Sequence, residues 1–135
     1  NWMTTGQLIR HISDSCGAPM KGFVTGDWGM PDGMDMADLK PEDMMPAAEK
    51  LPTVASVAEA LSMLAVDKKT ALDMVAKCSE ESLGTTMVAA PWSPEKKPLG
   101  YYLLDMVEHL KAHRSQLFYY LKLQGNPVHT GHLWG

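Results

Sequence analysis

The stretch "PLGYYLLDMVEHLKAHRSQLFYYLKLQGNP", residues 98–127, decides the fold. Its apolar residues recur at helical spacing, Pro98 suits the first turn of a helix, and Gly125 suits the left-handed residue after a helix end. The second proline, two residues later, would prevent continuation. We therefore predict one helix from Leu99 to Gln124, about 39 Å long at 1.5 Å per residue.

A helix is also predicted near the start of the chain. In "TTGQLIRHISDSCG", Thr4 precedes Gln7 by three residues, which is the spacing of a capping box, so the helix should begin at Thr4 or Thr5. Gly17, with a proline behind it, predicts its end. Residues 17–52 carry Gly and Pro at short intervals and predict a long ordered loop rich in methionine.

A long helix is predicted after this loop, because apolar residues recur at helical spacing through "TVASVAEALSMLAVDKKTALDMVAKCSEESL". Its start should be Thr53 or Ser56, since Ser56 and Glu59 form a second possible capping box. No alternating strand pattern is present anywhere in the chain. We therefore predict an all-α fold.

Length and composition limit the class of protein. The 135 residues are 45% hydrophobic, which suits one domain covering residues 1–135 with a single core. A formal net charge of -4 and scattered basic residues argue against nucleic-acid binding. No apolar run approaches a membrane span and no signal peptide is recognisable, so we expect a cytoplasmic protein without membrane contact. Cys16 and Cys78 lack metal-site spacing and should be reduced thiols.

Two histidines, His109 and His113, fall about 40° apart on the predicted last helix, on its apolar face. Burying two imidazoles without partners leaves nitrogens unsatisfied, at roughly 1 to 3 kcal/mol each, and a shared metal ion would accept both lone pairs. On this pair alone, ordinary, partly buried histidines are the favoured interpretation. His11 borders the apolar stripe of the first helix, and one helix contact would bring all three rings together. Three histidines would leave a coordination position open, as in catalytic zinc sites.

Other candidate ligands are weaker. His129 and His132 follow the helix terminator among Gly and Thr, so we expect a solvated tail rather than a ligand pair. Acidic residues of the loop could add a carboxylate to the metal, although such residues usually face water; these are Asp27, Asp32, Asp35 and Asp38.

Two motifs resemble those of the DinB-like superfamily, also called YfiT-like metalloenzymes. They are "W..T.GQLIRHI" from Trp2 to Ile12 and "HLKAHRSQLFYYLKLQG" from His109 to Gly125. The resemblance implies a four-helix bundle of up-down-down-up type, with a divalent metal, zinc or nickel, held by His11, His109 and His113.

The resemblance also extends to neighbouring residues and to the assembly. Arg114 and Gln116 belong to the second motif: Arg114 should form an ion pair with a helix or loop or bind a substrate anion, and Gln116 should orient a ligand imidazole. The family's bundle has a helix before the Trp-containing segment, and this sequence has none there. We expect that helix to be absent from this numbering, or the bundle to be completed by a second chain, as in a homodimer.

Characterised relatives include bacillithiol S-transferases and the mycothiol-dependent maleylpyruvate isomerase. The resemblance thus implies a small-molecule substrate and a low-molecular-weight thiol as cosubstrate, activated as thiolate on the metal. A metal-dependent hydrolase would use the same three histidines. A non-catalytic stress-response bundle that binds a metal or small molecule, and a purely structural bundle, remain alternatives. The sequence nominates no catalytic base.

Overall fold

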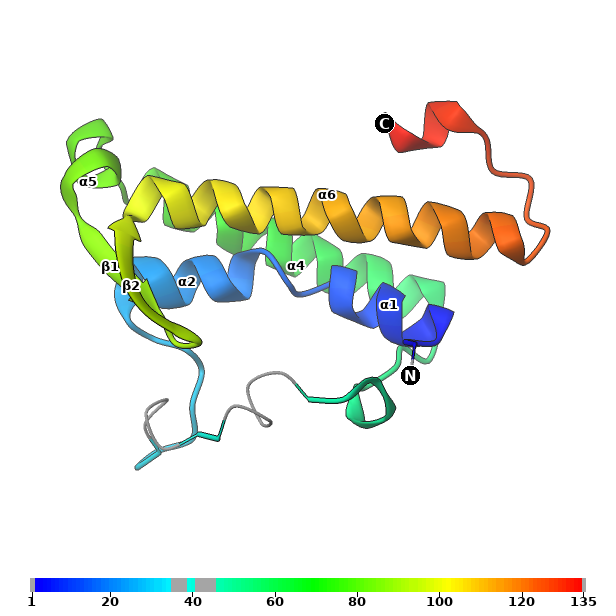
Figure 1. Ribbon diagram of the computed structural model, residues 1–135, viewed down its shortest axis with the longest axis horizontal. Helices are drawn as coiled ribbons and strands as arrows, with labels where there is room; N and C mark the ends of the chain where they lie inside the picture. Colours follow the sequence, from blue (N-terminus) through cyan, green and yellow to red (C-terminus); the bar gives the residue numbers. More distant parts are fainter. Residues whose placement is uncertain (1, 35–38, 41–45, 135) are drawn as a thin grey trace.

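The computed structural model describes residues 2–34, 39–40 and 46–134, which form five α-helices and one β-hairpin (Figure 1). The helices are α1 (Thr5–Ile12), α2 (Gly17–Thr25), α4 (Val57–Ala76), α5 (Glu80–Thr85) and α6 (Leu99–Leu123). The strands are β1 (Met87–Ala90) and β2 (Ser93–Pro98), and two short 3-10 helices are η2 (Ala48–Lys50) and η3 (Thr130–Leu133).

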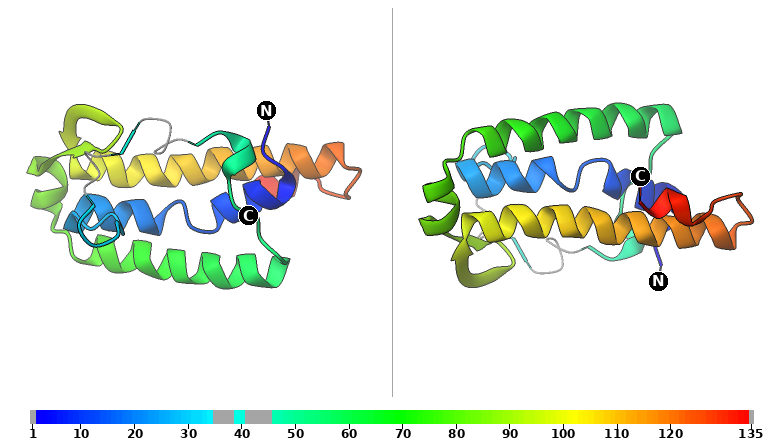
Figure 2. Two further views of the ribbon diagram at one scale, coloured as in Figure 1. Left: turned by 90° about the horizontal axis from the view of Figure 1, so that it is seen from below. Right: turned by 90° about the horizontal axis from the view of Figure 1, so that it is seen from above.

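In the described part of the chain, α4 and α6 lie side by side with the consecutive helices α1 and α2 (Figure 2). Helices α1 and α2 follow one another and lie between α4 and α6 in both views of Figure 2. Helix α2 packs against both long helices, whereas α1 packs mainly against α6. The fold is therefore predominantly helical, and a complete four-helix bundle remains an expectation.

The prediction of an all-α fold is wrong in one respect, because β1 and β2 pair as an antiparallel hairpin between Met87 and Pro98. Strand β2 reads "SPEKKP", with no apolar alternation and two prolines. Proline is tolerated in strands only at edges, so this sequence carries no ordinary strand signal. The hairpin leads directly into α6, and the backbone N–H of Leu99 donates to the carbonyl oxygen of Thr86 at 2.8 Å.

The helix ends that short-range chemistry specifies lie close to the predicted positions. Helix α6 ends at Leu123, one residue before the predicted end, and Gly125 has a φ of 77° as a left-handed cap requires. The Thr4–Gln7 capping box is present. Of the two predicted starts for the long helix, Ser56 is correct, because its hydroxyl accepts from the backbone N–H of Glu59.

The predicted loop after Gly17 is wrong at its beginning, because Gly17 starts α2 instead of ending α1. The carboxylate of Asp67, on α4, accepts backbone hydrogen bonds from Cys16, Gly17 and Ala18 at 3.2, 2.9 and 3.1 Å. It therefore caps α2 from another helix. A Cβ at Gly17 would lie 2.1 Å from the carbonyl oxygen of Asp67, so only glycine allows this approach. Pro19 falls in the first turn, where its missing N–H costs nothing.

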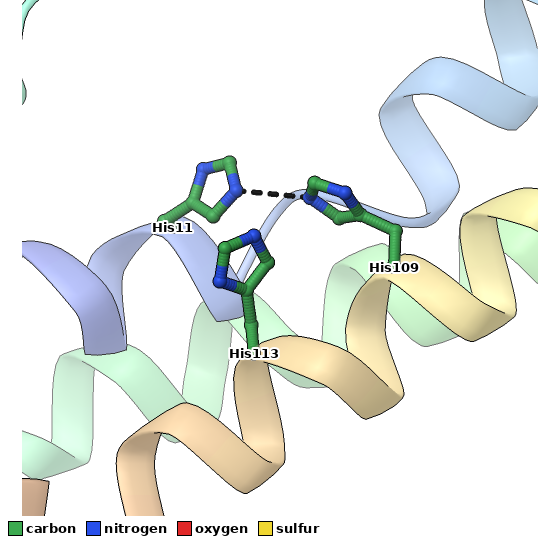
Figure 3. Close-up of side chains that lie close together, drawn as sticks. All are labelled: His11, His109 and His113. Carbon is green, nitrogen blue, oxygen red and sulfur yellow. Dashed lines mark hydrogen bonds between the residues drawn. The ribbon is translucent and has the colours of Figure 1, made fainter.

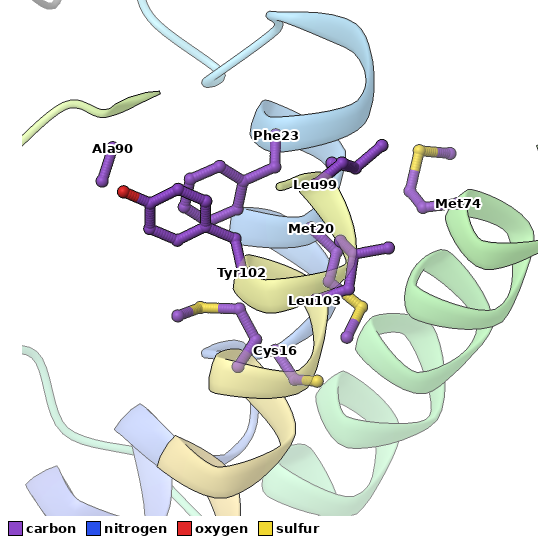
Figure 4. Packing of buried hydrophobic residues seen from close by; sticks show 9 residues of the cluster. Cys16, Met20, Phe23, Met74, Ala90, Leu99, Tyr102 and Leu103 are labelled. Atoms are coloured by element: carbon purple, nitrogen blue, oxygen red, sulfur yellow. The ribbon is translucent and has the colours of Figure 1, made fainter. Parts of the chain in front are cut away.

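The core lies at the α2 end of the molecule, where the first half of α6 meets α2, α4 and the hairpin (Figure 4). Phe23 stacks on Tyr102 with ring centroids 4.4 Å apart. Around this pair pack the other buried members of the cluster: Cys16, Met20, Met74, Ala90, Leu99, Leu103 and Met106. Cys16 and Cys78 are both free thiols, and each lies just outside a helix rather than within one.

Helix α4 exposes several large apolar side chains. Val57, Leu61 and Leu72 are each more than half exposed, and Leu104 of α6 is 70% exposed. These side chains do not make a membrane span: within residues 2–34, 39–40 and 46–134, no helix is both long and apolar enough to cross a bilayer. Where exposed apolar side chains gather, the surface is typically one that contacts protein.

Candidate metal centre

Three histidines from two distant parts of the chain face one another where α1 meets α6 (Figure 3). The Nε2 atoms of His11 and His109 are 3.0 Å apart. His113 completes the group, with its ring centroid 4.6 Å from that of His11 and 4.4 Å from that of His109. One nitrogen from each ring can be chosen so that all three lie within 4.8 Å of one another.

Each element that carries a histidine is fixed by its own contacts. Helix α6 presents His109 and His113 on one face because they are four residues apart. Helix α1 holds His11 in its last turn and buries Leu8 completely. Its first turn is tied to the end of α6 by Gln124, whose Nε2 donates to the hydroxyl of Thr5 at 2.6 Å. The fold thus brings together residues 98 positions apart.

A second side chain in α1 attaches the helix to the segment before α4. The amide Nε2 of Gln7 donates to the carbonyl oxygens of Ala48 and Leu51, at 2.7 and 2.9 Å. The same residue forms the capping box, so its two amide atoms serve both the helix start and a tertiary contact. The position of His11 therefore depends on Gln7 and Gln124, which both hold the part of α1 that precedes it.

Burial favours the neutral form of two of the histidines. It lowers the pKa of His11 and His109 from the usual value, and the neighbouring His113 lowers the pKa of both further. Asp14 acts on His11, and Asp105 on His109, in the opposite direction. A neutral imidazole has a free lone pair, which is the form that binds a metal.

The third histidine has a hydrogen-bonded orienting partner. Oε1 of Gln116 lies 2.8 Å from Nδ1 of His113 and can accept a hydrogen bond from it, which leaves the lone pair on Nε2. Metal-binding histidines usually have such a partner on the other nitrogen. The motif residue Gln116 thus contacts the histidine group directly.

The geometry of the three rings fits a divalent ion. With bonds of about 2.0 to 2.1 Å in tetrahedral geometry, two ligand nitrogens on zinc lie about 3.3 Å apart. The 3.0 Å between His11 and His109 is close to this value, and a ring nitrogen of His113 lies within 4.8 Å of both. Without an ion, two of these rings can only share a single hydrogen bond. The donor set of three imidazoles suits a divalent transition-metal ion and leaves room for a further ligand.

The remaining motif residue, Arg114, is half-buried on α6 and forms no ion pair with any described residue. Its Nε is buried and has no hydrogen-bond partner in the described part of the chain. The expected ion pair is therefore not seen in this region, and its role as a substrate-anion ligand stays a prediction.

The side chains of the tail histidines, His129 and His132, accept hydrogen bonds from backbone N–H groups at η3. Nδ1 of His129 accepts from the N–H of Gly131 at 3.2 Å, and Nδ1 of His132 accepts from the N–H of His129 at 3.0 Å. Both side chains are exposed, in agreement with a solvated tail. Within the described ranges they join no cluster of three metal-binding residues.

The loop aspartates that the structure describes do not belong to the cluster of three histidines. Asp27 forms an ion pair with Lys21, and Asp32 is exposed. Asp35 and Asp38 lie outside the described residues. The ion pair and its hydrogen bond also lower the pKa of Asp27, which keeps this carboxylate charged and facing water.

A cavity of about 540 Å³ opens beside the histidines. Its lining includes His11 and His109, together with four side chains that sequence reasoning missed: Trp28, Trp92, Asp14 and Asp105. Asp105 precedes His109 by four residues on α6, so helical spacing could have found it. The two tryptophans come from the loop after α2 and from the turn of the hairpin, where no periodic pattern exists.

Comparison with known proteins identifies one protein family that the chain matches. The family model described as the DinB superfamily matches residues 2–117, a range that includes His11, His109 and His113. No curated protein matches the chain, and no solved structure does. Since the matched range covers most of the 135 residues, the chain belongs to the DinB superfamily.

Proposed function

We propose that His11, His109 and His113 hold one divalent metal ion, zinc or nickel, and that the protein is a metal-dependent enzyme. The observation that carries the proposal is the convergence of three imidazole nitrogens within 4.8 Å from helices far apart in the sequence. Three protein ligands with an open position are typical of catalytic rather than structural zinc.

The favoured activity is transfer of a low-molecular-weight thiol to an electrophile. When bound, the ion would supply Lewis acidity that lowers the pKa of a coordinated thiol. Burial lowers the pKa of His11 and His109 and so favours their metal-binding neutral form, and Gln116 lies in hydrogen-bond contact with His113. The adjoining cavity, with walls formed by Trp28 and Trp92, offers an organic substrate apolar contact next to this position.

Thiol chemistry fits a reducing compartment, so the cytoplasm remains the proposed location. A hydrolase that uses metal-bound water would need the same three histidines, and the substrate assay below distinguishes the two activities.

The first test is metal content per chain by plasma mass spectrometry, on protein purified without a polyhistidine tag. We expect about one equivalent in the wild type and in His132→Ala, and almost none in His113→Ala. His132 is a matched control because it lies outside the cluster and is exposed. Equal content in all three proteins, or none after incubation with zinc and nickel, would remove the basis of the proposal.

The second test is turnover by metal-loaded and chelator-treated protein. A thiol panel with a chlorinated nitroaromatic should give product only with the loaded wild type, if the protein is a transferase. Hydrolysis of activated esters without thiol dependence would instead favour the hydrolase. Loaded protein that turns over neither substrate class would leave a non-catalytic binding protein as the better description.

We also propose that the protein is a homodimer that covers the apolar surface of α4 and α6. Val57, Leu61, Leu72 and Leu104 are exposed in the single chain and support this proposal. The molar mass by light scattering should be twice that of one chain and should fall to one chain in Leu61→Glu. A wild-type mass of one chain at tens of micromolar would contradict it.

A further inference from the structure

The cavity beside the histidines has an aromatic corner. The rings of Trp28 and Trp92 meet at 75° with centroids 6.3 Å apart. Phe23, from the core, contacts both rings edge to face, at 4.9 and 6.0 Å. Two aromatic rings at nearly a right angle form two walls of the kind of cage that surrounds organic cations.

The position of Trp28 is fixed by a glycine. A Cβ at Gly22 would lie 2.3 Å from the Trp28 ring, so the indole lies directly against the backbone of α2. A larger residue at position 22 would push the ring away. The corner is therefore built into the fold at one side, while Trp92 on the hairpin turn is 48% exposed and closes the other side.

The charged residues of this lining are both acidic: Asp14 and Asp105, with no lysine or arginine among the lining residues. Asp14 is already paired with Arg10 of α1. Asp105 forms no ion pair with any lysine or arginine of the described ranges, although it acts electrostatically on His109. Its charge is therefore available to a ligand in the cavity.

A polar atom in the wall also lacks a partner. Ser15 is 7% exposed and belongs to the lining, and its hydroxyl has no hydrogen-bond partner within the described part of the chain. Buried hydroxyls in proteins are normally hydrogen-bonded. This hydroxyl oxygen is almost fully enclosed, so the groups of the lining that a cation can reach are the aromatic corner and Asp105, which is an exposed residue.

We propose that the cavity binds the cationic group of a small molecule, an amine or a quaternary ammonium, between the aromatic corner and Asp105. The opposite end of that molecule lies toward His11 and His109, which line the same cavity. The inference rests on the proposed function because it names the substrate class of the same site, but binding of the cation itself requires no metal.

The test uses choline and its neutral isostere 3,3-dimethyl-1-butanol, which has the same shape without the charge. Titrations of chelator-treated and zinc-loaded protein are followed by the indole N–H signals in NMR spectra, assigned with single Trp→Phe variants. Choline should shift the signals of Trp28 and Trp92 in a saturable way. The signals of Trp2 and Trp134, whose residues are 84% and 80% exposed, should not move.

Variants test the charge separately from the apolar walls. Asp105→Asn should weaken choline binding about tenfold, and Trp92→Leu should weaken it by a similar factor. Glu108→Gln is the matched control, since Glu108 is an exposed carboxylate of the same helix that pairs with Lys111 outside the cavity. Binding of the neutral isostere with equal affinity, or equal loss in Glu108→Gln, would overturn the inference.

The two proposals fail in different ways. If zinc binds with one equivalent per chain and choline shifts no indole signal, the cation site is wrong and the metal site stands. If choline binds the chelator-treated protein and zinc does not bind, the cation site stands without the proposed reaction.

Discussion

The carboxylate of Asp67 and the histidine cluster lie at two sides of the same break between α1 and α2, and they differ in how completely their polar atoms are paired. Asp67 is 5% exposed and accepts three backbone hydrogen bonds. The three imidazoles are half-buried and share one contact between His11 and His109, plus the contact of His113 with Gln116. A fully paired buried group serves the fold, whereas incompletely paired groups that converge indicate a ligand site.

The largest effect on stability should come from removing the fully paired carboxylate of Asp67. Asp67→Ala leaves three backbone N–H groups of α2 without an acceptor, so we expect the free energy of unfolding to fall by about 3 kcal/mol or more. Urea unfolding measures it. Asp73→Ala, which removes an exposed partner of Lys69, should cost less than about 0.5 kcal/mol. Similar losses in both variants would show that the cap is not a main contributor to stability.

The histidine cluster should behave in the opposite way. His109→Ala should change the free energy of unfolding of metal-free protein by less than about 1 kcal/mol. Free zinc at about 100 times its dissociation constant should stabilise the wild type by about 2.7 kcal/mol, and His109→Ala should lose this gain. Thermal unfolding with and without zinc measures both quantities. A zinc gain that survives in the variant would contradict a site on these ligands.

A smaller effect should follow from removing the orienting partner. Gln116→Ala leaves all three imidazoles in place but frees the ring of His113, so we expect zinc affinity to fall by about 10- to 100-fold. Competition with a chromophoric chelator measures the affinity. Ser115→Ala is the control, since its hydroxyl bonds only the helix backbone at Lys111. Unchanged affinity in Gln116→Ala would mean that packing alone orients His113.

The smallest effect concerns pH in the metal-free protein. The pKa of His11 and of His109 is lowered in the folded state, so the unfolded chain binds more protons below its own histidine pKa. Stability is therefore unaffected above about pH 6.5 and falls as the pH drops below it, until the folded-state pKa values are reached. Urea unfolding at pH 7.5 and 5.5 measures the fall. The fall in stability should be smaller in His11→Gln and unchanged in His129→Gln. A fall of equal size in both variants would mean that other groups cause the pH dependence.

The sequence predicts what is encoded by neighbouring residues. Pro98 and Gly125 mark the ends of α6 almost to the residue, and Thr4 with Gln7 marks the start of α1. The prediction that Gly17 ends α1 is wrong because the group that caps α2 is Asp67, 50 positions further along the chain. A glycine that stops one helix and a glycine that starts the next look the same when the capping side chain is distant.

The candidate site likewise combines residues that local spacing predicts with residues that only distant contacts bring together. The spacing of His109 and His113, with the family resemblance, was enough to nominate the three histidines that the structure brings together. The cavity walls were not predictable, because Trp28 and Trp92 meet through a glycine contact and a hairpin turn. Tertiary contacts of this kind leave no period in the sequence.

The break between α1 and α2 also separates two helices that bury different numbers of side chains. Helix α2 is joined to α4 through Asp67 and Gly17, whereas α1 has eight residues and buries only Leu8 fully. An ion on His11 would link this short helix to α6. The backbone amides of α1 should then exchange with deuterium early in the metal-free protein and much later once zinc is bound. Site occupancy and the local folding of the amino-terminal helix would thus be one coupled equilibrium.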